Sequence, residues 1–330
     1  MDETDSPRRI LFVSLGMFII DTIVPLSGET LQDIIGGAGT YAAIGSRVFT
    51  APGETGFVVD YGNDVPGSVE TTIDGLGLSL LVRRDNRRKC TRGLNTYRGS
   101  LRHFEYLTPK IRITPSQLTP SFLRSRTFHL ISSPDRTTAQ MQELGRLRRD
   151  LGCADDALSL WEPVPDCCVP TNKDAFVESA KHVDIVSPNA DEAAGLLSYT
   201  LQSDVTRQVE QMAHEMRGFG VGTIVIRSAA LGSYVSSPDL SKWYPAYLED
   251  QAKVIDATGA GNTFCGALVT LLGQNETLDR AMCGATVAAG LSIMQTGLPE
   301  LTQSDGLDLW NGAAAKQLVE EYRTRNNMTK

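Results

Sequence analysis

Apolar runs of strand length alternate with helical patterns along most of this chain, and that alternation restricts the fold more than any other feature. Strand-like runs fall at 10–15, 55–60, 127–132, 157–161, 183–187 and 223–228. Helical spacing of apolar and small residues falls at 39–50, 137–150, 171–181 and 204–219. Strands separated by helices of this length predict a mostly parallel sheet with helices on both faces and right-handed crossovers.

One segment departs from this alternation. Residues 69–115 form short alternating pieces with many arginines and little continuous apolar surface, which suits an excursion from the main sheet. The arginines are typical of a solvated face, although they could also meet a phosphorylated or carboxylated substrate. A chain of 330 residues is long enough for one large α/β domain that carries such an appendage.

Composition and charge argue against several classes of partner and of site. The net charge of −8 argues against binding to nucleic acid or acidic membranes through bulk electrostatics. The six cysteines are scattered without a CxxC pair, so neither a disulfide framework nor a zinc site follows, and a reduced, cytoplasmic protein is expected. The apolar run at 10–20 is too short to span a bilayer, and we interpret it as a buried first strand.

A turn of small residues lies late in the chain, at Thr258-Gly259-Ala260-Gly261. Val254 and Ile255 before it are predicted to end a buried strand, and an apolar-faced helix is predicted from Asn262 onward. Small residues let the backbone approach a ligand closely, and their N–H groups lie at the positive end of the helix. The turn therefore suits a phosphate, although a tight strand-to-helix connection without a ligand explains it equally well when it is considered alone.

Residues 256–262, Asp-Ala-Thr-Gly-Ala-Gly-Asn, resemble the C-terminal signature of the ribokinase (PfkB) family of carbohydrate and nucleoside kinases. Gly-Gly-Ala-Gly-Thr-Tyr-Ala-Ala at 36–43 and Trp-Tyr-Pro-Ala-Tyr at 243–247 resemble the fungal maintenance-of-killer branch of that family. The resemblance spans nearly the whole chain. It implies a single ribokinase-like domain of three α/β/α layers with a small β-rich lid, which we place at 69–115 with help from 22–31. A homodimer formed through the lid is left open.

On the acceptor side, the resemblance implies roles for four residues. Asp21 matches an aspartate that holds substrate hydroxyls, and Gly36 and Gly37 match glycines that let the backbone approach the substrate. Tyr41 stands where the family commonly has asparagine, and it can donate one hydrogen bond but fills more room. A solvated turn is the alternative for the aspartate, and simple packing is the alternative for the tyrosine.

On the nucleotide side, Asn189 and Glu192 follow a predicted strand and open a helix. The resemblance implies that they order Mg²⁺ and its waters beside the nucleotide phosphates, and hard oxygen ligands suit that ion. The same spacing is that of a capping box, and the two interpretations are compatible.

The strand and loop beneath the nucleotide resemble those of the family at Arg227, Ser228 and Gly232, with Ala229 where glycine is usual. Asp256 opens the signature and belongs to the same predicted nucleotide site. Arg227 could reach phosphates from the end of its strand, or it could pair with an acidic residue.

Asn262 occupies the position of the family's catalytic aspartate, which takes the proton from the substrate hydroxyl. An amide cannot accept that proton, and a positioned general base typically contributes ~10²–10⁴-fold in rate. Phosphoryl transfer depends mostly on positioning and electrostatics, however, so a slow kinase is physically allowed. Restoring the carboxylate through Asn262→Asp is expected to raise the rate.

The leading interpretation is an ATP- and Mg²⁺-dependent phosphotransferase that acts on a hydroxyl of a small sugar-like or nucleoside-like substrate. The anion hole would be formed by Gly259, Ala260 and Gly261. The alternative is a catalytically inactive binding or scaffold protein that keeps the pocket, and a third interpretation is a pocket turned to other chemistry. Hydride transfer is disfavoured because the turn lacks the spacing of a dinucleotide-binding fingerprint.

Overall fold

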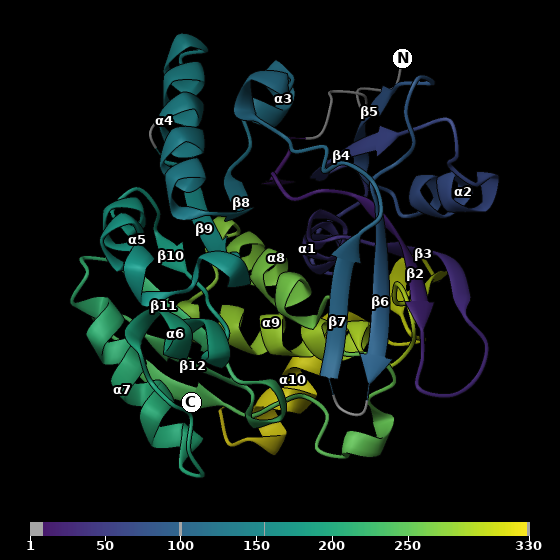
Figure 1. Cartoon of the computed structure of the whole chain (residues 1–330). Helices are drawn as coiled ribbons and strands as arrows, with labels where there is room; N and C mark the ends of the chain where they lie inside the picture. Colours follow the sequence, from purple (N-terminus) through teal and green to yellow (C-terminus); the bar gives the residue numbers. More distant parts are fainter. Residues whose placement is uncertain (1–8, 99–100, 155, 329–330) are drawn as a thin grey trace.

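The structure, a computed structural model, describes residues 9–98, 101–154 and 156–328. A nine-stranded sheet forms its centre (Figure 1). In spatial order its strands are β13 (Ser241–Tyr244), β12 (Ser233–Ser236), β11 (Thr223–Arg227), β10 (Ile185–Val186), β9 (Leu158–Pro163), β8 (Thr127–Ser132), β1 (Phe12–Ser14), β4 (Thr55–Tyr61) and β5 (Ser79–Arg84). The pairs from β11 to β5 are parallel, and β12 and β13 add an antiparallel edge. Each of the six predicted strand-like runs overlaps one of these strands.

Helices cover both faces of this sheet, each over its own cluster of buried apolar side chains. One face carries α1 (Ala38–Arg47), α2 (Gly67–Gly75), α8 (Ala260–Gly273), α9 (Leu278–Ser292) and α10 (Ala315–Arg325). The other carries α3 (Pro120–Leu123), α4 (Pro134–Asp150), α5 (Lys173–Ala180), α6 (Ala190–Leu197) and α7 (Val205–Arg217). The predicted three-layer α/β/α fold with a mostly parallel sheet is therefore confirmed.

Glycines bring α1 and α8 into direct backbone contact. A Cβ on Gly45 of α1 would overlap the carbonyl oxygen of Thr263, and one on Gly266 of α8 would overlap the carbonyl oxygen of Ala42. Only glycine allows two helices to approach this closely at both positions. Because α1 follows Gly36-Gly37 and α8 follows the late glycine turn, this contact holds the two motifs side by side.

A second, four-stranded sheet stands beside the main body in Figure 1 and forms the lid. Its order is β3 (Leu31–Gly36), β2 (Ile19–Val24), β6 (Arg92–Arg98) and β7 (Leu101–Tyr106). The lid was correctly expected to be small and β-rich, but its predicted bounds need correction at both ends. Half of it comes from the early segment around 22–31, which was expected only to assist.

The first part of the predicted lid, 69–84, belongs to the main body instead. It supplies most of α2 and the edge strand β5, which pairs in parallel with β4. β5 is a short strand at the edge of the sheet and carries two arginines, so its sequence alone does not distinguish it from a lid strand. The arginines of this region pair with acids of the body, as Arg83 does with Asp60 and Arg84 with Glu70.

Two further features complete the fold. A hairpin of β14 (Leu301–Ser304) and β15 (Leu307–Trp310) precedes α10. Val254 and Ile255, predicted as the end of a buried strand, instead follow a short 3-10 turn, and Ile255 is 62% exposed. That prediction was wrong because the loop is held by a backbone hydrogen bond from Ile255 to Ile293, outside any sheet. Across the described residues, no helix combines the length and apolarity needed to cross a membrane.

Candidate active site

The late glycine turn adopts a conformation that exposes the N-terminus of α8. Gly259 has a φ of 81°, in the left-handed region that favours glycine, and the helix begins at Ala260. The carboxylate of Asp256 accepts a hydrogen bond of 2.9 Å from the backbone N–H of Thr258 and so fixes the turn. The first-turn N–H groups of a helix that has no side-chain cap form an anion site.

The turn is also held from two sides by tyrosines. Tyr97 of lid strand β6 donates a hydrogen bond of 3.0 Å to Asp256 and lies 3.2 Å from the hydroxyl of Thr258. The buried ring of Tyr41 packs so closely against Gly259 that a Cβ there would overlap it. The structure thus places Tyr41 against the turn, in the packing role that was its alternative.

A cavity of about 420 Å³ adjoins the turn and has the size of a small-molecule site. Most of its lining is small and apolar. It is lined by Ala257, Ala260 and Gly261 of the turn, by Ala229, Ala230, Gly232 and Ser233 of the β11–β12 loop, by Thr286, Ala289, Gly290 and Ile293 at α9, and by Asn189, Arg227, Ala246, Tyr247, Leu248, Gln251, Val254 and Phe264. Small residues of α9, Ala289 and Gly290, border this cavity as well.

Arg227, at the end of β11, lies at the floor of the cavity between two carboxylates. Its Nη1 is 2.9 Å from Glu162 Oε1, its Nη2 is 3.6 Å from Glu192 Oε2, and Nη2 also donates to the carbonyl of Ser187 at 2.8 Å. A Cβ on Gly261 would overlap Nη1, so the guanidinium lies directly below the anion turn. Both alternatives considered for Arg227 are thus combined, because it is paired with acids and also faces the cavity.

Glu162, at the end of β9, also belongs to the site, and the sequence did not single it out. Its Oε2 accepts from Asn262 Nδ2 at 2.7 Å and lies 2.8 Å from Nε2 of His129 on β8. His129 Nδ1 is in turn 3.0 Å from the hydroxyl of Ser14 on β1. Burial by itself raises the pKa of Glu162, but the charge of Arg227 and the hydrogen bonds from His129 and Asn262 outweigh it and lower the pKa to about 2.

Asn189 and Glu192 form a capping box at the start of α6. The backbone N–H of Glu192 donates to Asn189 Oδ1 at 2.8 Å, and that of Asn189 donates to Glu192 Oε2 at 2.7 Å. Burial raises the pKa of Glu192, and the charge of Arg227 opposes that rise. These oxygens already serve the cap, and the described residues offer no group of three metal-binding side chains. The donor set therefore fits a water-bridged Mg²⁺ held mainly by phosphate oxygens, rather than a protein cage.

The residues of the nucleotide loop hold its shape. The backbone N–H of Ser228 donates to the carbonyl of Gly232 at 2.7 Å, and Gly232, with a φ of 94°, lines the cavity. Ala229 has a φ of 47°, a left-handed conformation that is strained for a residue with a Cβ. The glycine that is usual there would relieve this strain.

The acceptor-side residues come together at the base of the lid. Asp21 was expected in a turn after the first strand, but it lies within lid strand β2 and is 4% exposed. Its carboxylate contacts Gly36 of β3 and Gly93 of β6, because a Cβ on either glycine would overlap one of its oxygens. Gly37 follows with a φ of 97° and caps α1. Asp21, Gly36 and Gly37 thus form one unit, whereas Tyr41 faces the turn.

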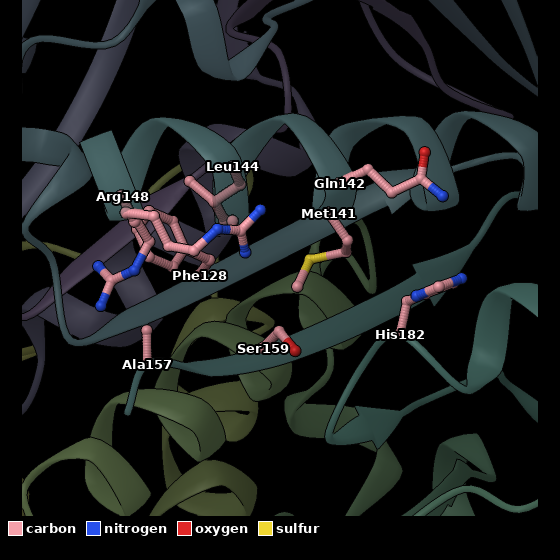
Figure 2. A pocket seen from close by; sticks show the side chains of 10 residues that line it. Phe128, Met141, Gln142, Leu144, Arg148, Ala157, Ser159 and His182 are labelled. Carbon is pink, nitrogen blue, oxygen red and sulfur yellow. The ribbon is translucent and has the colours of Figure 1, made fainter. Parts of the chain in front are cut away.

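Figure 2 shows a second cavity, of about 350 Å³. It opens between α4 and the amino ends of β8 and β9, whereas Glu162 and Arg227 lie at the carboxyl ends of their strands. Arg148 at its rim donates to the backbone carbonyls of Leu123, Ser125 and Ala154, which is a packing role.

Residues 122–303 of the chain match the family described as pfkB family carbohydrate kinase. An uncharacterized protein of Schizosaccharomyces pombe is 34% identical over 347 residues, which cover 96% of this chain and 94% of that protein. Protein MAK32 of Saccharomyces cerevisiae is 30% identical over 355 residues, which cover 99% and 96%. The resemblance to the fungal branch is therefore confirmed.

Solved structures share the fold. A ribokinase from Giardia lamblia superposes with a TM-score of 0.68 at 17% identity, covering 95% of this chain and 99% of that one. An E. coli protein described as a ribokinase II, in complex with ATP and Mg²⁺, gives 0.66 at 15% identity, covering 96% and 99%. Together with the full-length fungal relatives and the matched signature region, these comparisons show that the chain belongs to the pfkB family of carbohydrate kinases.

Proposed function

We propose that this protein is an ATP-dependent phosphotransferase that acts slowly on a hydroxyl group of a small sugar-like or nucleoside-like substrate. The observation that carries the proposal is the cavity beneath the uncapped N-terminus of α8, with Arg227 at its floor. A helix N-terminus and a guanidinium both bind phosphate oxygens, and the small apolar lining leaves room for a planar base.

The proposed roles follow from the positions of the residues. Gly259, Ala260 and Gly261 form the proposed anion hole, in which the backbone N–H groups of Gly259 and Gly261 would stabilise the charge of the phosphoryl group in transfer. The N–H of Ala260 donates to the carbonyl of Ala257 at 3.3 Å, so it would have to leave that partner to join them. Arg227, Ser228, Gly232 and Asp256 shape the nucleotide side. Asn189 and Glu192 would hold Mg²⁺ through its waters, and the ion would supply positive charge beside the phosphates of ATP, the donor of the phosphoryl group.

The acceptor is proposed to lie between the lid and the turn. Asp21 and the backbone of Gly36 and Gly37 would hold its hydroxyls. Asn262 would meet the reacting hydroxyl through its amide oxygen, which can accept a hydrogen bond but cannot keep the proton. Loss of a general base typically reduces the rate by ~10²–10⁴-fold, so turnover is expected to be slow.

A binding or scaffold protein is the second candidate, and one observation favours it. The two side chains at the base position are an amide and a carboxylate whose pKa is about 2, so neither is suited to take a proton near neutral pH. A protein of this kind would bind nucleotide without transferring phosphate.

Phosphate-transfer assays over pentoses, hexoses and nucleosides, with and without Mg²⁺, separate the two candidates. Slow transfer that requires Mg²⁺ supports the kinase. Nucleotide binding without transfer to any acceptor supports the scaffold.

Three expectations about location and partners complete the proposal. The partner is a small molecule rather than nucleic acid or a membrane, as the acidic charge suggests. A cytoplasmic location is supported by six cysteines that are all free. A homodimer through the lid is supported by two exposed leucines at the β2–β3 hairpin, Leu26 at 64% and Leu31 at 39%. Size-exclusion chromatography of a Leu26→Ser variant tests the dimer.

A further inference from the structure

Glu162 is a buried carboxylate to which the proposed function has assigned no role. Its side chain is 3% exposed, yet Arg227, His129 and Asn262 all direct N–H groups at it from three different elements. Burying an ionised carboxylate is costly unless it is paired and hydrogen-bonded. A carboxylate with this many partners, 2.7 Å from the residue at the base position, requires an explanation.

The contact fixes which way Asn262 faces. An ionised carboxylate only accepts hydrogen bonds, so Asn262 must turn its NH₂ toward Glu162. The amide oxygen diverges from the amide nitrogen and is therefore directed away from Glu162. Without the carboxylate of Glu162, this contact would not determine whether the amide nitrogen or the amide oxygen of Asn262 faces position 162.

The histidine reinforces the same arrangement. The hydroxyl of Ser14 accepts from the backbone N–H of Gly16 at 3.0 Å, which leaves its own hydrogen free to donate to His129 Nδ1. The Nε2–H of His129 then donates to Glu162. This serine, histidine and glutamate have the composition of a hydrolytic triad, but Ser14 and His129 are fully buried, so no substrate reaches them. The hydrogen-bonded chain from Ser14 through His129 to Glu162 therefore has a structural role, because it links β1, β8 and β9.

We propose that Glu162 is the positioning residue of this site, carrying from strand β9 the negative charge that the family signature places at position 262, while Asn262 supplies the matching amide. Glu162 does not act as the base, because its oxygens are taken up by Arg227, His129 and Asn262 and it is shielded from the cavity. It orients Asn262 and holds Arg227 beneath the anion turn. The part of this inference that concerns catalysis rests on the proposed function.

The contact with Glu162 lowers the increase in rate that is expected from Asn262→Asp. That substitution alone would place a second carboxylate at hydrogen-bond distance from Glu162, and two like charges in one site cannot both be ionised cheaply. The pair would hold one proton at neutral pH, so the new aspartate would be a poor base. Exchanging both residues, as in Glu162→Gln with Asn262→Asp, keeps one carboxylate and one amide in contact.

The test is a cycle of four proteins: wild type, Asn262→Asp, Glu162→Gln and the double variant, with exposed Asn327→Asp as the matched control. Their thermal unfolding is measured from pH 5 to pH 8. The other ionisable groups that face the pair are His129 on β8, Arg227 on β11, Glu192 on α6 and Cys265 on α8.

In Asn262→Asp, repulsion raises the folded-state pKa of the carboxyl pair above its unfolded value, so stability is gained as pH falls and lost as pH rises. We expect a Tm at pH 8 about 5 °C or more below wild type, with most of the loss recovered at pH 5. The double variant should lie within about 2 °C of wild type and show no such pH dependence, because its charge is unchanged. The control should not move.

Phosphate transfer gives a readout that a purely structural role would not move. At pH 8 the double variant should transfer phosphate faster than Asn262→Asp and faster than wild type, within the ~10²–10⁴-fold that a base provides. Additive, pH-independent Tm changes would overturn the role of Glu162, whether or not transfer occurs. Coupled Tm changes with no transfer in any variant would leave Glu162 as the partner of Asn262 and would reject the kinase instead.

Discussion

The two sides of the glycine turn differ in what they leave open. On the nucleotide side, small residues border a cavity of about 420 Å³, and Arg227 lies at its floor. On the acceptor side, the ring of Tyr41 packs against the turn, Asp21 is wedged against two glycines, and Asn262 is bonded to Glu162. The nucleotide side has space for a ligand, whereas on the acceptor side Tyr41, Asp21 and Asn262 already contact other residues of the protein.

Under the proposed function, nucleotide binding and turnover therefore depend on different sides of the turn. Nucleotide binding depends on space, backbone N–H groups and one cation, and all three are present. Proton removal depends on one carboxylate with a suitable pKa, and the carboxylate here is held by three donors. Substitutions that act on one side only can therefore test whether the two sides differ in this way.

Removing the cation of the nucleotide side should have the largest effect. In Arg227→Met, Glu162 remains buried without its partner at 2.9 Å, and breaking a buried pair in this way typically costs about 3–5 kcal/mol. Nucleotide binding should be lost as well. Chemical denaturation gives the free energy of unfolding, and a nucleotide titration of the folded fraction gives the affinity. Arg84→Met, in an exposed pair with Glu70, is the control and should leave the free energy of unfolding nearly unchanged. Equal costs for the two variants would contradict the buried-pair account.

Gly259→Ala, in the turn between the two sides, should have the second-largest effect on the free energy of unfolding. Gly259→Ala combines a left-handed φ of 81° with a Cβ that overlaps the ring of Tyr41, and we expect a loss of about 2–4 kcal/mol. Gly53→Ala isolates the backbone effect, because Gly53 has a φ of 87° and an open environment. Urea denaturation of both variants measures the difference. If Gly53→Ala costs as much, then Tyr41 does not crowd the turn.

Glu192→Gln should separate metal binding from folding. Gln can still accept the N–H of Asn189, so the capping box persists and unfolding should change by less than about 1 kcal/mol. Burial raises the pKa of Glu192, so the wild-type carboxyl contributes stability at low pH and loses it as pH rises through the folded pKa. The variant should therefore lack this loss.

Mg²⁺-dependent nucleotide affinity should fall by about tenfold in the same variant if Glu192 orders the waters of the ion. Calorimetric titration with and without Mg²⁺ measures this. A fall in stability with unchanged affinity would leave the capping box as the whole role of Glu192.

Relief of strain in the nucleotide loop should be the smallest effect. Ala229→Gly removes the cost of a φ of 47° but adds unfolded-state entropy, so we expect a gain of about 0.5–1 kcal/mol. Gly232→Ala is the opposite case, since its Cβ would overlap the carbonyl oxygen of Tyr244 at a φ of 94°. Differential scanning calorimetry on both would show a rise for the first and a fall for the second. A fall for both would mean that the loop requires the side chain of Ala229.

Much of the fold could be predicted, because the periodicity of strands and helices depends on residues that are close together in the sequence. The strand at 127–132 and the turn at 258–261 lie where the sequence placed them. Glu162 and His129 were missed because their meaning depends on contacts across strands that are far apart in the chain. A polar residue within the apolar run 127–132, and another directly after the run 157–161, were the available signals.

The lid bounds were mistaken for the same reason. Edge strand β5 and lid strand β6 both lie in the arginine-rich segment, and only their pairing partners distinguish them. Likewise, the sequence alone indicates only that Asn262 stands in place of a catalytic base. The structure shows that the residue is one half of a pair, so its substitution cannot be interpreted without Glu162.

The most direct test of the difference between the two sides is a thermal-shift titration of the wild-type protein with ATP, with and without Mg²⁺. A ligand that binds only the native state stabilises it by mass action, by about 2.7 kcal/mol at a concentration one hundred times its Kd. We predict a concentration-dependent rise in Tm with ATP that is larger when Mg²⁺ is present and absent in Arg227→Gln. No rise with ATP under either condition would show that the nucleotide side is not a binding site and would contradict the account.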